Sequence, residues 1–174
     1  ALACLALPVA SLESKVLTIC EKKLTVDLGP GYEIRSIVFD TSSKGMVLDE
    51  FLINNTAEPG ATAFVSILTI YDEILTKMNP DALSELFLIG GLDALKEEGD
   101  AQIGKWTAFD SRGRNVSVIM MKTADDGARM TDGIYNGGIY NISIWNLDIT
   151  TYALLVSPFD EDNTTQLIKT LAVS

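Results

Sequence analysis

Carboxylates are the most abundant groups in this chain that could do chemistry. The sequence has 24 Asp and Glu residues, 13 Lys and Arg residues and no histidine. Histidine is the side chain that most often transfers protons near neutral pH, and it is the commonest metal ligand. Its absence excludes Ser-His-Asp and Cys-His catalytic sites and His-based zinc or iron sites in this chain, which leaves the carboxylates as candidate reactive groups.

One dense group of acids falls in a stretch with the composition of an exposed loop. Asp125 and Asp126 lie in this stretch, and Asp132 follows shortly after it. Calcium takes six to eight oxygen ligands from carboxylates and carbonyls, so these three residues are candidate calcium ligands. The alternative is solvated loop charge, because the alternating acids and terminal Glu of an EF-hand loop are missing. We expect no cofactor other than this calcium ion.

A second possibility is a hydrolase that uses two carboxylates. Asp49, Glu50 and Asp110 lie in or at the ends of predicted strands, and Asp126 is a further candidate. In glycoside hydrolysis an acid and a base lie about 5 to 10 Å apart across a sugar-binding cleft. The sequence does not fix that distance, and exposed strand faces carry such residues routinely.

The segment from Gly133 contains aromatic and amide side chains that could bind a ligand. Tyr135, Tyr140 and Trp145 recur every five residues, each followed by Asn, as at Asn141. Aromatics with amides are common in carbohydrate and peptide recognition. An odd spacing sends successive aromatics to opposite faces of a strand unless a bulge intervenes, so the alternative is a strand with core aromatics.

The N-terminal residues 1–20 are expected to be an apolar arm or the remnant of a secretory signal. The first charge is at Glu13, and small residues follow Pro8, as at a signal cleavage site. The run is too short to span a bilayer, which takes about 20 apolar residues. With the sequons at Asn54, Asn115, Asn141 and Asn163, this start predicts a secreted or surface-associated protein.

Cys4 and Cys20 are the two cysteines of the chain. In a secreted protein they could form one disulfide that closes a short loop and stabilises the fold by roughly 2 to 4 kcal/mol. They could equally be two buried free thiols. Cys4 is also a possible lipid attachment site, since Ala1 to Ala3 loosely resemble a bacterial lipobox.

The charge balance limits the partners. A formal net charge of -11 repels phosphate groups, so nucleic acid and anionic membranes are not expected partners. No transmembrane helix is expected. This leaves an unidentified protein or small molecule, or a second copy of the chain bound through the apolar N-terminal arm.

The elements that would position these residues follow from hydrophobic periodicity and turn signals. Residues 64–78 have apolar side chains at helical spacing, and Asn79-Pro80 begins a second helix that runs through Glu97, with a break or tight contact at Gly90-Gly91. A final helix begins at Ser157 as its cap, with Pro158 in its first turn. Strands are expected at residues 24–28, 32–40, 46–54, 103–110, 115–122, 138–146 and 151–157.

This order, strands, two helices, four strands and a C-terminal helix, predicts an α+β fold. The strands should form a mainly antiparallel sheet covered by helices, in one domain over residues 21–174. A chain of 174 residues has the length of one domain.

Two segments resemble a known family. Leu-Thr-Val-Asp-Leu followed by Gly-Pro-Gly-Tyr-Glu-Ile, and a closing strand, loop and helix from Leu154 to Leu171, are similar to the PsbP/Mog1-like family of α/β/α sandwiches. The resemblance covers about 30 residues. It implies an accessory or binding module, since the family is mostly noncatalytic and has no shared active-site motif.

The leading hypothesis is therefore a noncatalytic, extracytoplasmic binding or accessory domain. A carboxylate-dependent hydrolase and a self-associating structural subunit are the alternatives.

Overall fold

The structure is a computed structural model that describes residues 13–19, 22–29, 31–37, 45–56, 61–124 and 138–174. These residues form ten strands, two α-helices and one short 3-10 helix. All the strand pairs are antiparallel, which confirms the predicted α+β class with a mainly antiparallel sheet.

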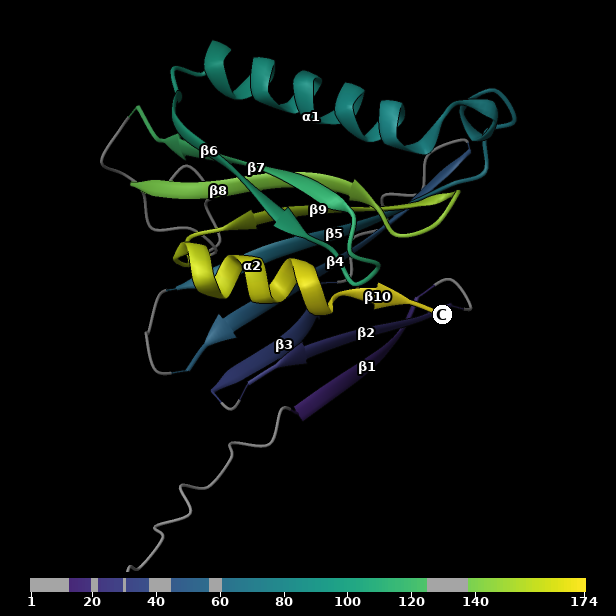
Figure 1. The fold of residues 1–174 in the computed structure, drawn as a ribbon, viewed down its shortest axis with the longest axis horizontal. Helices are drawn as coiled ribbons and strands as arrows, with labels where there is room; N and C mark the ends of the chain where they lie inside the picture. Colours follow the sequence, from purple (N-terminus) through teal and green to yellow (C-terminus); the bar gives the residue numbers. More distant parts are fainter. Residues whose placement is uncertain (1–12, 20–21, 30, 38–44, 57–60, 125–137) are drawn as a thin grey trace, which may run out of the picture.

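Seven strands form the main sheet (Figure 1). The strand of this sheet that comes last in the sequence lies at the centre of the sheet. The strands on one side of it come from the N-terminal part of the chain, and those on the other side come from later residues. In spatial order the strands are β3 (Tyr32–Ile37), β4 (Met46–Asn55), β5 (Thr62–Ile70), β9 (Thr151–Ser157), β8 (Ile139–Asn146), β7 (Asn115–Lys122) and β6 (Ala101–Phe109).

Two pairs of strands predicted to follow one another in the sequence, 32–40 with 46–54 and 103–110 with 115–122, pair as antiparallel hairpins. β3 pairs with β4 with Ile34 opposite Ile53, and β6 pairs with β7 across a turn in which Gly113 has a φ of 73°. The β6–β7 register shifts between Gln102 and Gly104, next to the edge of the sheet.

A smaller sheet has the order β1-β2-β10 and consists of β1 (Glu13–Ile19), β2 (Lys22–Leu28) and β10 (Ala172–Val173). β1 lies within the segment expected to be an N-terminal arm. The rest of that segment, residues 1–12 and 20, lies outside the described residues.

The two helices lie on opposite sides of the main sheet (Figure 1). α1 (Pro80–Glu97) begins as predicted: the Asn79 side chain accepts hydrogen bonds from the backbone N–H groups of Asp81 and Ala82, at 2.9 and 3.1 Å. These bonds satisfy donors that have no partner within the helix. The 3-10 helix η1 (Leu75–Lys77) precedes α1, and α2 (Glu161–Thr170) follows β9.

Alternate residues of the strands supply two cores. The core on the α2 side contains Leu24 of β2, Phe51, Val65 and Leu155 of the main sheet, and Leu167 of α2. The core on the α1 side includes, among others, Leu88 and Leu92 of the helix with Ile119, Met121 and Ile142 of β7 and β8. α1 therefore covers only part of the sheet face on which it packs. Leu52 of β4 and Phe64 of β5 lie on the same face, outside this covered part, and are half-buried.

The prediction of a helix over residues 64–78 is wrong. Residues 62–70 form β5, in which Val65 and Ile67 are buried on one face and Ser66 and Ile70 on the other. A strand buried on both faces has no polar side, so its apolar residues also match helical spacing by chance. The fold therefore has one α-helix between β5 and β6, preceded by the short 3-10 helix η1.

Two smaller predictions about the helices are also wrong. Ser157 is the last residue of β9, and Asp160 caps α2 by accepting a hydrogen bond from the N–H of Asn163 at 2.8 Å. Pro158 consequently lies before α2. Gly90-Gly91 makes no break, because α1 continues through it to Glu97.

In the part of the chain that the structure describes, no helix is long and apolar enough to cross a membrane.

Candidate functional site

An apolar groove of about 510 Å³ lies between α1 and the main sheet. Its volume is within the range of small-molecule sites, about 300 to 1,000 Å³. Most of its walls are hydrocarbon. The helix contributes Phe87, Gly91, Ala94 and Leu95, and the sheet contributes Tyr140, Ile142, Ile144, Leu154 and Val156.

Where α1 borders the groove, it carries small side chains. Gly91 is half-buried, yet no neighbouring atom lies within 4 Å of the position that a Cβ would take. Ala94, on the next turn of the helix, is also small. Gly90 likewise has open space around it, but it is exposed and does not border the groove. Larger residues of α1 before and after Gly91, such as Leu88 and Leu95, pack against the sheet instead.

One end of the groove is polar. Asp100 follows α1 and is 5% exposed. The Tyr140 hydroxyl donates a hydrogen bond to its Oδ2 at 2.7 Å, and the N–H of Ala124 donates to its Oδ1 at 3.1 Å. These bonds fix the carboxylate beside the apolar walls.

A second pocket, of about 420 Å³, lies on the other side of α1 and is more polar. Apolar residues of the helix and of β7 form its base, and Ile144 borders both pockets. Its charged residues include both signs: Asp81 and Glu85 of α1, Lys105 of β6, and Asp110 and Arg114 of the β6–β7 turn.

Hydrogen bonds close the end of this second pocket. Arg114 donates from Nε and Nη2 to Asp110 Oδ2 at 2.9 and 2.6 Å, and it also donates to the Asn146 side chain. Asn146 Nδ2 donates to Asp81 Oδ1 at 2.7 Å. This network joins the β6–β7 turn, the end of β8 and the start of α1.

The pKa of Asp110 reflects this network. Burial raises the pKa of the carboxyl, but the Arg114 side chain and the backbone N–H groups of Arg114 and Arg112 donate to the carboxylate and lower it by more. The net pKa lies below the ordinary value. Asp110 is therefore suited to anchoring the turn, and not to donating a proton as a general acid.

Of the candidate hydrolase residues, Asp126 lies outside the described residues, and the structure does not bring Asp49 and Glu50 close to Asp110. Glu50 lies on β4 and Asp110 follows β6, and four strands separate β4 from β6. Five steps of about 4.8 Å place them roughly 24 Å apart along the sheet, far beyond the spacing of a glycosidase pair. Asp49 and Glu50 are consecutive in a strand and so face opposite sides.

Glu50 faces the same side of the sheet as α1. The strand register places it opposite Ser66, which is opposite Leu154 in the wall of the groove. Burial raises the pKa of the Glu50 carboxyl.

The predicted ligand-binding residues are divided between the two faces of the sheet, as their five-residue spacing predicts. Tyr140 borders the apolar groove, whereas Trp145 packs in the core on the α2 side. Asn141 is buried and donates to the Phe159 carbonyl at 2.7 Å, which does not suit the sequon for glycosylation. Tyr135 lies outside the described residues.

The predicted calcium ligands Asp125, Asp126 and Asp132 also lie outside the described residues, as do Cys4 and Cys20. Elsewhere, in the ranges that the structure describes, no group of three or more His, Cys, Asp or Glu side chains is placed to hold a metal ion.

Sequence reasoning did not identify Asp100 or Gly91 as site residues. Asp100 has no local motif, because its partner Tyr140 is 40 residues away. The Gly90-Gly91 pair is the available signal for Gly91, but such a pair in a helix predicts a kink or a packing site rather than open space.

No protein-family model matches the chain, and no similar protein is found among curated proteins or solved structures.

Proposed function

We propose that the protein is a noncatalytic binding domain that holds a small, mainly apolar ligand in the groove beneath α1. The observation that carries this proposal is the open, apolar space beside Gly91. A glycine in a helix interior costs about 1 kcal/mol relative to alanine, and a groove in a core forgoes packing contacts. A bound ligand would restore those contacts.

Burial of apolar surface would drive binding. Ile144, Leu154 and Val156 are half-buried at the wall of the groove. Each square ångström of apolar surface removed from water stabilises a complex by about 25 cal/mol before the costs of association are counted.

The sequence supports a noncatalytic role in an extracytoplasmic location. The resemblance to the PsbP/Mog1-like family implies an accessory or binding module, and the apolar start of the chain favours export. The hydrolase alternative has less support, because Asp110 is bonded to Arg114 and lies far from Glu50 along the sheet.

Filling the groove tests the proposal. A neutral naphthylamine dye, whose fluorescence rises in apolar surroundings, should bind the unaltered protein. Gly91→Leu should weaken dye binding by tenfold or more, because the new side chain enters the groove. Gly90→Leu is the matched control: it makes the same change one residue away, at an exposed position, and should leave binding unchanged.

Both substitutions replace a helical glycine, so both should maintain or raise the melting temperature. Dye binding that is equal in the two variants, or absent from the unaltered protein, would contradict the proposed site.

A further inference from the structure

We propose that the second pocket, on the other side of α1 from the groove, binds an α-amino acid with an apolar side chain. The ammonium group of this ligand would lie beside Glu85, its carboxylate beside Lys105, and its hydrocarbon part on the floor of the pocket. The inference goes beyond the proposed function, because it concerns a separate pocket that adjoins the groove at Ile144.

Three of the five charged residues that line this pocket are already bonded to one another. Arg114 donates to Asp110, and its Nη1 lies 3.8 Å from Asp81 Oδ1. Asp81 also accepts a hydrogen bond from Asn146. This end of the pocket is therefore a closed network, which leaves little capacity to bind a ligand.

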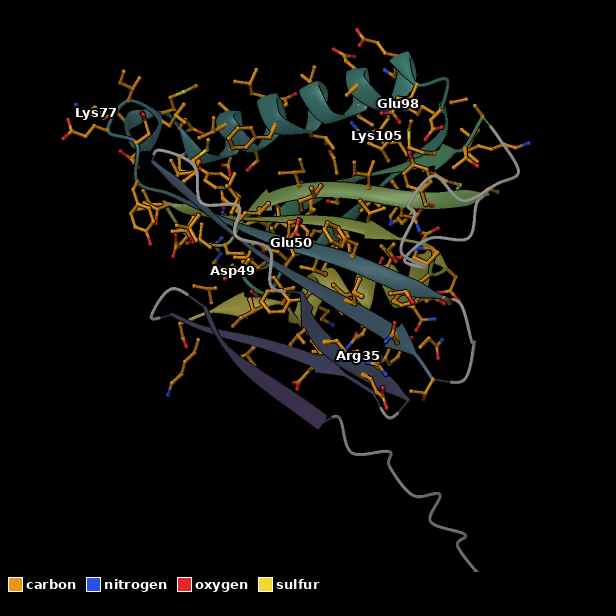
Figure 2. The ribbon with its side chains drawn as sticks, turned by 180° about the vertical axis from the view of Figure 1, so that it is seen from behind. Arg35, Asp49, Glu50, Lys77, Glu98 and Lys105 are labelled. Atoms are coloured by element: carbon orange, nitrogen blue, oxygen red, sulfur yellow. The ribbon has the colours of Figure 1, made fainter. Side chains whose placement is uncertain are left out.

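The other two charged residues, Glu85 and Lys105, are not part of this network. Both side chains are exposed, and among the residues that the structure describes neither has a hydrogen bond or an ion pair. They come from opposite walls, Glu85 from α1 and Lys105 from β6. In Figure 2, Lys105 lies beneath α1, whereas Lys77 lies by the start of the helix. The pocket thus presents one negative and one positive charge from facing elements.

These two charges select a ligand that carries both signs. A ligand with a single charge can pair with one of the two residues, but it meets a like charge on the opposite wall, which disfavours it. An α-amino acid has an ammonium and a carboxylate group on one carbon atom, so it can pair with both walls. Hydrogen bonds between charged groups are roughly twice as strong as those between neutral groups.

The floor of the pocket is apolar. Leu88 and Leu92 of α1 and Ile119 of β7 are buried there, and Ile144 of β8 is half-buried. An apolar side chain that covers this floor removes hydrocarbon surface from water, which favours binding. The volume of about 420 Å³ is within the range of small-molecule sites.

Three ligands that share a phenyl ring and differ in their charged groups test the proposal. L-Phenylalanine has both charges, 2-phenylethylamine has only the ammonium group, and 3-phenylpropanoate has only the carboxylate. Isothermal titration calorimetry at neutral pH measures the dissociation constant of each. Phenylalanine should bind most tightly, and each of the others should bind about two- to fivefold more weakly, the range of one exposed ion pair.

Two substitutions locate the charges. Lys105→Gln should weaken the binding of phenylalanine and 3-phenylpropanoate by about two- to fivefold, but not that of 2-phenylethylamine. Glu85→Gln should weaken the binding of phenylalanine and 2-phenylethylamine by a similar factor, but not that of 3-phenylpropanoate. Because both residues are exposed, both variants should fold as the unaltered protein does.

Matched controls remove the same charges outside the pocket. Lys77→Gln and Glu97→Gln change exposed residues that do not border it, and they should leave the binding of all three ligands unchanged. Gly91→Leu, which fills the groove, should also leave phenylalanine binding unchanged.

The proposal is overturned if phenylalanine does not bind, or if either singly charged ligand binds as tightly as phenylalanine does. It is also overturned if the two control substitutions weaken binding as much as Lys105→Gln and Glu85→Gln do. Weaker phenylalanine binding by Gly91→Leu would place the amino acid in the groove and so overturn it too. The dye test of the groove is a separate measurement, so this proposal and the proposed function can fail independently.

Discussion

Two carboxylates on this sheet have pKa values shifted in opposite directions. Asp110 has a lowered pKa because donors from Arg114 and Arg112 outweigh its burial. Glu50 has a raised pKa because burial acts without such donors. A change of pH should therefore alter their contributions to stability with opposite signs.

Asp110→Asn should destabilise the protein at neutral pH by about 1 to 3 kcal/mol, the cost of weakening a buried, charge-assisted hydrogen bond. The lowered pKa means that Asp110 stabilises the fold above its unfolded value of about 3.9, and that this contribution is lost as pH falls through the folded pKa. The difference from the unaltered protein should thus shrink in acid. Urea unfolding across this pH range measures it.

Asp93→Asn is the control, because Asp93 is 67% exposed and lies 4.0 Å from Lys96. It should change the free energy of unfolding by no more than about 0.5 kcal/mol. Equal effects of the two substitutions would show that the Asp110 network does not stabilise the fold.

Glu50→Gln should raise the free energy of unfolding at neutral pH, since the neutral amide avoids the burial of a charge. Because the pKa of Glu50 is raised in the folded state, its contribution to stability is complete below the unfolded pKa of about 4.3. This contribution is lost as the pH rises through the pKa of the folded state. The variant and the unaltered protein should therefore converge in acid. Melting temperatures at neutral and acidic pH measure this effect, with the exposed Glu97→Gln as the control. A Glu50→Gln variant that is less stable than the unaltered protein at neutral pH would contradict it.

Among the elements, α1 and β5 show which structures local sequence signals predict and which they do not. The start of α1 could be predicted because its signals are local. The Asn79 side chain accepts hydrogen bonds from free N–H groups of the first turn, and Pro80 has no N–H group that needs a partner. β5 could not, because its burial on both faces depends on α1, α2 and β9, which are distant in sequence.

Two isoleucines distinguish a strand from a helix in this region. Ile67 and Ile74 would share one face of a helix over residues 64–78, but in the structure Ile67 is fully buried and Ile74 is 76% exposed. Ile67→Ala should destabilise by about 2 to 5 kcal/mol, and Ile74→Ala by less than about 0.5 kcal/mol. Chemical denaturation measures both. Similar losses at the two positions would favour the helix.

For the whole molecule, the sequence was sufficient for the α+β class and the strands of both hairpins, because each depends on local turns and alternation. It was not sufficient for the groove. The groove depends on how far α1 stands from β8 and β9, and that distance is set by side chains such as Leu88, Leu92 and Ile142 from elements far apart in the chain. Tyr140 could be proposed from its type, but its partner Asp100 could not.

The insertion of β9 between β5 and β8 has a consequence for synthesis on the ribosome. Until residues 151–157 have emerged, β5 has no neighbour on one side, and its unpaired backbone is flanked by apolar residues on both faces. Such an edge pairs readily with other chains. A nascent chain that has completed β3, β4 and β5 must therefore wait for most of the remaining sequence before its most aggregation-prone strand is protected.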